Sequence, residues 1–413
     1  MKFVVATYGT EGDTRPLSAL SRGLMDAGHE VRLFADGATL GSPTSLGIPA
    51  TALAGDMKAV LRDTNVLTEA GGSRVRNLAA AFAQIANANT AAWMKDIAAA
   101  AQGGDAILVS GLAAFVGFSV AEYLDIPAIG LGLIPITPTA AFASPFLPPR
   151  TLPGWLNRPS HRFVNAMVWR AFRTATNVAR AAVCKLPPRR AVWTDLPMLY
   201  GVSPSLLPRP GDWPEDVHVC GQWLTRAPEW TPPPSLSDFL NAGEPPLYVG
   251  FGSMAGFERR KLLDVVIAAV AGRRALFYGG WSGVDAAELP ANFLAIGETP
   301  HDWLFPKTSL VVHHGGSGTT HSAARAGVPS VVVPFAGDQP FWADRLRLAG
   351  VAAPATNAKA LTSAALAGGI AFAERTDTRA RAATLGKQMA TEDGRTAAVT
   401  AIETIMSKRR PHL

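Results

Sequence analysis

The sequence predicts an α/β protein made of two doubly wound domains that face each other across a cleft. Short apolar runs alternate with helical patterns along the chain, and its 413 residues exceed the size of one ordinary domain. A stretch rich in Pro and Trp divides the two halves near residue 215. Fully apolar strands are typical of parallel sheets covered by helices on both faces. We therefore expect ligands at the carboxyl ends of the strands.

The first half opens with a βαβ pattern. The run 2–8 (KFVVATY) is predicted as a strand, a helical pattern with one apolar face follows, and 30–35 (EVRLFA) is the next strand. Two strands joined by a helix within about 35 residues imply a parallel sheet. The apolar runs 106–110 and 127–133 are further strands of this sheet.

The second half repeats this logic. Its predicted strands are 246–252, 275–280, 293–297, 310–314 and 330–335. We expect a Rossmann-like first domain over 1–215 and a Rossmann-like second domain over 216–390. The remaining residues, 391–413, are predicted as a C-terminal helix that packs back on the first domain.

Composition excludes several classes of protein. Apolar residues make up 48% and charged residues 17%, which is typical of a folded core, and the net charge of +6 comes without the dense Lys/Arg tract of nucleic-acid binding. Cys184 and Cys220 cannot form a disulfide framework, which favours a reducing cytoplasm. The uncharged apolar stretch 107–121 is interrupted by glycine and is too short to span a bilayer. We expect a cytoplasmic protein, with peripheral contact to a membrane left open.

Two neighbouring segments differ from the rest. Residues 133–155 are apolar and Pro-rich and are predicted to be irregular. No acidic residue occurs from Ile126 to Thr194, whereas this stretch carries Arg158, Arg162, Arg170, Arg173, Arg180, Lys185, Arg189 and Arg190. One interpretation is a solvated basic helix face. The other is an apolar entry lip beside a basic patch that contacts an anionic membrane or substrate.

The stretch VVHHGGSGTT, residues 311–320, favours phosphate over metal. Neighbouring strand residues point to opposite faces, so His313 and His314 cannot chelate one ion, and no Cys or carboxylate lies at ligand spacing. A Gly-rich turn between strand and helix lets backbone amides approach an anion, which the helix dipole also favours. A tight turn without a ligand is the alternative.

Two further strand ends carry polar groups. Asp338 and Gln339 follow the strand after the Gly-rich turn and can bind sugar hydroxyls. A phosphate cradle beside such a pair describes a nucleotide-sugar site. Asp13 follows the first strand in GTEGDTRP. It is either a helix N-cap or a general base that points into the cleft.

Several motifs together resemble glycosyltransferase family 1, which has the two-Rossmann GT-B fold. GTEGDTRP resembles the N-terminal Gly-x-x-Gly-Asp-x-x-Pro loop of the family, and SPSLLPRPGDWPEDVHVCGQW resembles its sterol glucosyltransferase branch. PLYVGFGSM and HDWLFPKTSLVVHHGGSGTTHSAARAGVPSVVVPFAGDQPFWADRL resemble the nucleotide-sugar domain. The resemblance covers nearly the whole chain and extends to glycosyltransferases of antibiotic and glycolipid pathways.

This resemblance implies a role for each matching residue. Asp13 would be the catalytic base, and Asp338 and Gln339 would hold the sugar hydroxyls. The diphosphate and nucleoside would be held by Ser253, Trp281, His301, Trp303, His313 and the turn residues Gly315, Gly316, Ser317, Gly318 and Thr319. The acceptor would bind within 133–155. The sequence departs from the family in lacking an Asp partner after Ser110, as suits a carboxylate base, and in having Glu298 where plant enzymes stack a Trp on uracil.

The resemblance implies an inverting transfer of a hexose from a nucleotide sugar to a hydroxyl of a hydrophobic acceptor, such as a sterol, polyketide, phenol or lipid. UDP-glucose is the favoured donor and a dTDP-sugar is left open. We expect no other cofactor and no metal, because the chain has no Asp-x-Asp. The alternatives are a nucleotide-sugar epimerase and a catalytically silent homologue that binds nucleotide or glycolipid.

Overall fold

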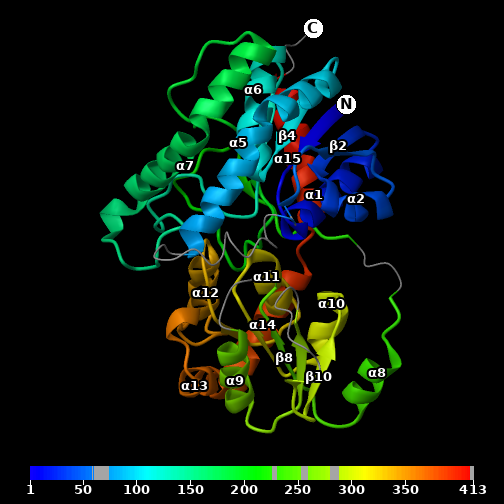
Figure 1. The fold of residues 1–413 in the computed structure, drawn as a ribbon, viewed down its shortest axis with the longest axis vertical. Helices are drawn as coiled ribbons and strands as arrows, with labels where there is room; N and C mark the ends of the chain where they lie inside the picture. Colours follow the sequence, from blue (N-terminus) through cyan, green and yellow to red (C-terminus); the bar gives the residue numbers. More distant parts are fainter. Residues whose placement is uncertain (58, 60–73, 226–229, 253–258, 280–287, 410–413) are drawn as a thin grey trace.

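The computed structural model describes all residues except 58, 60–73, 226–229, 253–258, 280–287 and 410–413. It contains two parallel sheets, which lie in the upper and lower lobes of Figure 1. The predicted α/β organisation with two doubly wound sheets is confirmed.

The first sheet has seven parallel strands in the order β3-β2-β1-β4-β5-β6-β7. They are β1 (Lys2–Ala6), β2 (Glu30–Asp36), β3 (Ala50–Leu53), β4 (Ala106–Val109), β5 (Ala128–Gly132), β6 (Met198–Tyr200) and β7 (Val217–Val219). The second sheet has five parallel strands in the order β10-β9-β8-β11-β12. They are β8 (Leu247–Gly250), β9 (Ala275–Tyr278), β10 (Phe293–Ile296), β11 (Leu310–His313) and β12 (Ser330–Val332).

Helices cover both faces of each sheet. Those of the first lobe are α1 (Glu11–Asp26), α2 (Gly41–Ser45), α5 (Arg74–Ala101), α6 (Ala114–Leu124), α7 (Asn157–Ala179) and α15 (Gly394–Arg409). Those of the second lobe are α8 (Pro234–Asn241), α9 (Arg259–Val270), α10 (His301–Leu304), α11 (Ser317–Arg325), α12 (Gln339–Leu348), α13 (Ser363–Glu374) and α14 (Thr376–Ala390).

The two-residue period of β1 explains why this strand is apolar throughout. Phe3 and Val5 pack into the core formed with α1 and α15, whereas Val4 and Ala6 pack into the core formed with α5 and α6. Successive side chains of a strand point to opposite faces, so a strand with helices on both sides needs apolar residues at every position.

Three strands were not predicted from the sequence. β3, β6 and β7 have only three or four residues each, too few to give a periodic signal. β7 lies just beyond the predicted boundary at residue 215 and forms the edge of the first sheet. We therefore propose that the boundary follows Val219.

The chain also returns to the first lobe at its C-terminal end. α15 packs on α1 through Val399, Ile402 and Met406, which belong to the same core as Leu20 and Leu24. Figure 1 shows α15 beside α1 in the upper lobe. The chain passes from the first lobe to the second after β7 and returns before α15. These two connections lie side by side, because Gly221 and Gly394 are in contact.

Candidate active site

Asp13 lies in the first turn of α1, which begins directly after β1. Thr10 is the N-cap, and Asp13 is the third helical residue. Its Oδ2 accepts hydrogen bonds from the Thr10 backbone N–H at 2.8 Å and from the Thr10 hydroxyl at 3.2 Å. The carboxylate occupies the space that a Cβ at residue 9 would need, which explains Gly9.

Asp13 therefore does help to cap α1, as one interpretation predicted, but it is not the N-cap residue. Asp13 completes a capping box from the helix interior rather than serving as the N-cap. Both hydrogen bonds use Oδ2, so Oδ1 has no hydrogen-bond partner among the residues that the structure describes. Burial raises the pKa of Asp13 above its ordinary value, against the opposing effect of the Thr10 hydrogen bonds.

The Gly-rich turn connects β11 to α11. Gly315 has φ of +89°, a conformation that favours glycine. Gly316 is the N-cap of α11 and has no side-chain capping bond. The amides of Ser317, Gly318 and Thr319 precede the first helical bond, which Thr320 donates to Gly316. These amides can bind an anion.

His313 ends β11 and is fully buried. Its Nδ1 accepts the Gly315 N–H at 3.1 Å, which leaves the proton of the neutral ring on Nε2. Nε2 has no partner among the described residues. Burial lowers the pKa of His313 to about 3, with His314 and His301 adding to the shift. His313 can therefore donate a hydrogen bond to a ligand as a neutral ring, but it cannot supply charge.

His314 does not share this environment. Its ring lies against Gly252 and Gly316, and burial lowers its pKa to about 4. The two histidines thus diverge, as expected for neighbours on a strand. Within the described residues, no three His, Cys, Asp or Glu side chains are grouped to hold a metal ion.

Asp338 and Gln339 lie at the start of α12, after β12. The Gln339 Oε1 accepts the backbone N–H groups of Phe335 at 2.7 Å and Ala336 at 3.0 Å, which fixes its carboxamide. The Asp338 Oδ2 accepts the Trp342 indole N–H at 2.7 Å. Burial raises the pKa of Asp338 to about 6, and the negative charge of Asp13 contributes to this shift.

Desolvation is the main cause of the raised pKa of Asp338, and the charge of Asp13, which follows a strand of the other sheet, adds a smaller contribution. Glu298 and Arg15 also face each other across the lobes, with Arg15 Nη2 3.5 Å from Glu298 Oε2. Glu298 of the second lobe therefore forms an ion pair with a residue of the first lobe.

His301 and Trp303 lie on α10 but have different surroundings. The His301 ring stacks on Phe305 with centroids 4.2 Å apart, and burial lowers its pKa to about 4, with Arg15 and His314 adding to the shift. Trp303 packs on Trp230 and lies under Lys307 Nζ, 3.9 Å from the ring centroid. The structure brings His301 toward Arg15 and His314, whereas the nucleoside role of Trp303 rests on the sequence alone. Ser253 and Trp281 lie outside the described residues.

The segment 133–155 has no helix or strand until a short 3-10 turn begins at Gly154. Its centre reaches the second lobe: the Phe142 and Phe341 rings are 5.2 Å apart, and Arg150 Nη2 lies 2.6 Å from Asp344 Oδ1. Both partners belong to α12, which begins beside Asp338. The predicted acceptor segment is therefore in contact with the helix that carries the predicted sugar-binding pair.

Sequence reasoning missed two residues of this site, Arg15 and Trp342, and it included Phe142 only within the broader segment 133–155. Arg15 is in the same motif as Asp13, and Trp342 follows Asp338 by one helical turn, a spacing that brings side chains together. That spacing was the available signal for Trp342. The contact between Phe142 and Phe341 has no such local signal.

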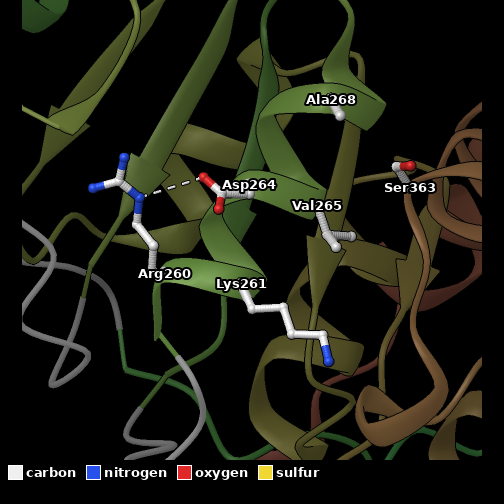
Figure 2. Close-up of a pocket in the computed structure, with 6 residues that line it drawn as sticks. All are labelled: Arg260, Lys261, Asp264, Val265, Ala268 and Ser363. Atoms are coloured by element: carbon white, nitrogen blue, oxygen red, sulfur yellow. Dashed lines mark ion pairs between the residues drawn. The ribbon is translucent and has the colours of Figure 1, made fainter.

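A separate hollow of about 520 Å³ lies on the second lobe. Figure 2 shows that Arg260, Lys261, Asp264, Val265 and Ala268 of α9 line it with Ser363 of α13. Arg260 and Asp264 form an exposed ion pair across one helical turn. None of these residues belongs to the site above, so the hollow plays no part in its chemistry.

Comparison with known proteins identifies relatives over the whole chain. Residues 277–405 match the family model of the erythromycin biosynthesis protein CIII-like C-terminal domain. O-mycaminosyltylonolide 6-deoxyallosyltransferase of Streptomyces fradiae is 34% identical over 411 residues, with 95% of each chain covered. Sterol 3-beta-glucosyltransferase UGT80A2 of Arabidopsis thaliana is 31% identical, with 97% of this chain and 65% of that protein covered. The chain thus spans about two thirds of that plant relative.

Solved structures show the same fold. The glycosyltransferase of kitacinnamycin superposes with a TM-score of 0.70 at 18% identity, covering 98% of this chain and 99% of that one. Glycosyltransferase VinC, solved in complex with DTDP, superposes with a TM-score of 0.68 at 20% identity, covering 99% of this chain and 100% of that one. With its two Rossmann-like sheets and relatives of this identity and coverage, the chain belongs to glycosyltransferase family 1 and has the GT-B fold.

Proposed function

We propose that this protein is an inverting glycosyltransferase that moves a hexose from a nucleotide sugar to a hydroxyl of a hydrophobic acceptor. One observation carries the proposal. Asp13 and Asp338 follow strands of different sheets, yet the charge of Asp13 raises the pKa of Asp338. This contribution supports the proposal that a base from one domain and a sugar-binding carboxylate from the other act in one site.

The Oδ1 of Asp13 would remove the acceptor proton. The freed oxygen attacks the anomeric carbon while the bond from that carbon to the diphosphate oxygen breaks, and the electron pair leaves with the nucleoside diphosphate. Attack opposite the leaving group converts an α-linked donor into a β-glycoside. The raised pKa of Asp13 supports this role, because a base is most effective when its pKa approaches the working pH.

The leaving diphosphate would be stabilised by fixed hydrogen-bond donors. These are the first amides of α11 and the Nε2–H of neutral His313, which lacks a protein partner in the described residues. We propose that these donors replace a metal ion. Asp338 and Gln339 would orient the sugar, and His301 and Trp303, with Ser253 and Trp281, would complete the donor site.

We propose UDP-glucose as the donor, because the sterol glucosyltransferase relatives are named for glucose transfer. A dTDP-sugar is the second candidate, since VinC was solved with DTDP. The names of the relatives, which act on a sterol and a tylonolide, support an apolar acceptor that binds along 133–155. The two buried cysteines, Cys184 and Cys220, are unpaired and support a reducing cytoplasm.

The proposal is tested by incubation with UDP-glucose or dTDP-glucose, with and without a panel of sterols, macrolides and phenols, followed by mass spectrometry. We expect a glycoside and free diphosphate, with turnover unchanged within about twofold in EDTA. An epimerised donor without a glycoside would favour the epimerase. No product with any pair would favour a silent binding protein. If EDTA abolished turnover and magnesium restored it, only the proposal that hydrogen-bond donors replace a metal ion would be contradicted, and glycosyl transfer would stand.

A further inference from the structure

Large apolar side chains remain exposed on α7 and just before it. Phe163, Met167 and Val178 are 64%, 53% and 65% exposed, and Trp155 is 76% exposed. Three of the other six large apolar side chains exposed in the described residues, Ile136, Phe146 and Val168, belong to the same helix or to the segment before it. Such a concentration of exposed apolar side chains is typical of an interaction site on a folded protein.

The exposed residues of α7 form one stripe. Phe163, Met167, Arg170, Thr174 and Val178 are separated by three or four residues and therefore share one face of the helix. The opposite side is buried, with Trp169 and Thr176 among its residues, and packs on α5. The stripe residues are exposed, and Figure 1 shows α7 along the outer edge of the upper lobe.

Positive charge borders this stripe. Arg162, Arg170 and Arg173 are exposed and have no ion pair among the described residues. Arg158, Arg180 and Arg189 behave differently, because they pair with Asp212 or Glu122 from outside the segment. Arg180 is buried, so a wholly solvated basic face is not what the structure contains. The absence of acidic residues between 126 and 194 leaves the outer cations of α7 uncompensated.

We propose that the outer face of α7, together with Trp155, docks on an anionic lipid surface. Exposed Phe, Met and Trp side chains would enter the boundary between head groups and acyl chains, and the three arginines would contact lipid phosphates. The charge argues against a second copy as the occupant, because a symmetric contact would bring the same cations together. Docking itself does not depend on the proposed reaction. If that reaction holds, docking brings segment 133–155, which leads directly into α7, to the phase in which apolar alcohols dissolve.

The charge component is tested by cosedimentation with phosphatidylcholine vesicles, with and without phosphatidylglycerol. We expect binding only to the anionic vesicles, weakening as salt increases. The double variant R170E/R173E should bind them on the order of tenfold or more weakly. The matched control is R379E/K387E, which makes the same charge change at exposed positions of α14 and should bind as the unaltered protein does.

The apolar component is tested with F163S/M167S, compared with L348S at an exposed apolar position of α12. The first should lose most vesicle binding and the second should not. Because all these side chains are exposed, the melting temperatures should not change, which separates docking from folding. Binding that survives both α7 variants, or equal binding to neutral vesicles, would overturn the proposal. A dimer that becomes a monomer in F163S/M167S would assign the face to a second copy and also overturn it.

Discussion

At the scale of single residues, the capping bonds and the proposed catalysis of Asp13 are compatible. The Thr10 hydrogen bonds hold Oδ2 and leave Oδ1 directed elsewhere. In an Asn variant, the carboxamide oxygen can keep the Thr10 bond, which turns its NH₂ to the former Oδ1 position. A group that donates there cannot remove a proton.

Asp13→Asn should therefore lower kcat by about 10²–10⁴. Its melting temperature should stay equal or rise. Burial raises the pKa of Asp13 in the folded protein, so above the ordinary pKa of Asp the ionised carboxylate disfavours folding, and neutral Asn removes that cost. The measurements are kcat and a thermal melt, with Glu11→Gln in the same helical turn as the control. Normal turnover would leave Asp13 as a capping residue only.

The pKa of Asp338 predicts how donor binding depends on pH. A carboxylate must be ionised to accept bonds from two hydroxyls, and the pKa of Asp338 is about 6. Affinity for the intact nucleotide sugar should therefore weaken as pH falls through about 6, whereas affinity for the free diphosphate should not. Asp338→Asn should lose this pH dependence and bind the nucleotide sugar roughly tens-fold more weakly at pH 8, since a bond to a charged group contributes about 1.5–3 kcal/mol. Calorimetry with both ligands checks this. If Asp338→Asn also loses the diphosphate, its role is structural.

At the scale of elements, α12 connects the proposed acceptor segment, 133–155, to the carboxylate that we propose binds the sugar. Phe142 of the segment packs on Phe341, which packs on the buried ring of Trp342, and Trp342 donates to Asp338. Arg345 adds a contact, with its guanidinium 5.0 Å from the Phe142 ring centroid. A shift of segment 133–155 would thus reach the sugar-binding carboxylate through a single packed row of rings.

Trp342→Phe separates the hydrogen bond from the packing. It keeps a buried ring but removes the N–H that lowers the pKa of Asp338. We expect the pH below which affinity for the nucleotide sugar weakens to move above 6. The KM for the donor should rise, with little change in the KM for the acceptor. Phe341→Leu is the matched variant: it keeps the indole bond and should raise the acceptor KM instead. Steady-state kinetics with each substrate varied in turn would show this crossed pattern. If each variant changed the donor KM and the acceptor KM equally, the hydrogen bond of Trp342 and the packing of Phe341 would not have separate roles.

At the scale of the whole molecule, the two domains influence each other through charge. The carboxylate of Asp13 raises the pKa of Asp338 across the lobes, and Arg15 with Glu298 and Arg150 with Asp344 form ion pairs between the lobes. The pair of Arg15 with Glu298 is exposed and contributes little stability, whereas Asp344 is largely buried in its pair with Arg150.

This coupling predicts a shift measured in one domain after a change in the other. In Asp13→Asn the negative charge beside Asp338 is absent, so the pKa of Asp338 should fall and donor binding should persist to lower pH. Glu11→Gln removes a carboxylate of the same helical turn that does not act on Asp338, and should leave the pH midpoint of donor binding unchanged. Calorimetric titration of the nucleotide sugar at several pH values measures both. If the pH midpoint of donor binding were identical in the unaltered protein and in both variants, the carboxylates of Asp13 and Asp338 would not be close in solution.

No helix among the described residues is both long and apolar enough to cross a membrane. The proposed lipid contact is a surface contact and rests on the exposed side chains of α7. Its dependence on charge and on exposed rings distinguishes it from the packing that holds the two lobes together.

The sequence by itself determined the two sheets and the expectation that the site lies at the carboxyl ends of their strands. Apolar runs of four or five residues at regular spacing predict buried parallel strands, and parallel strands present their carboxyl ends at one edge. His313 ends one such run, and Asp13 and Asp338 come after two others, so local pattern alone places each of them after or at the carboxyl end of a parallel strand. The Gly-rich turn was predictable for the same reason, since backbone conformation is a local property.

Only the tertiary structure decided what these residues do to one another. β3, β6 and β7 exist because neighbouring strands supply their hydrogen bonds, not because their own few residues favour extension. The neutral state of His313, the coupling of Asp13 to Asp338 and the contact of Phe142 with Phe341 all depend on burial and on residues far away in the chain. Periodicity records which face of an element is apolar. It does not record which distant element covers that face, and that partner determines desolvation, charge and hence chemistry.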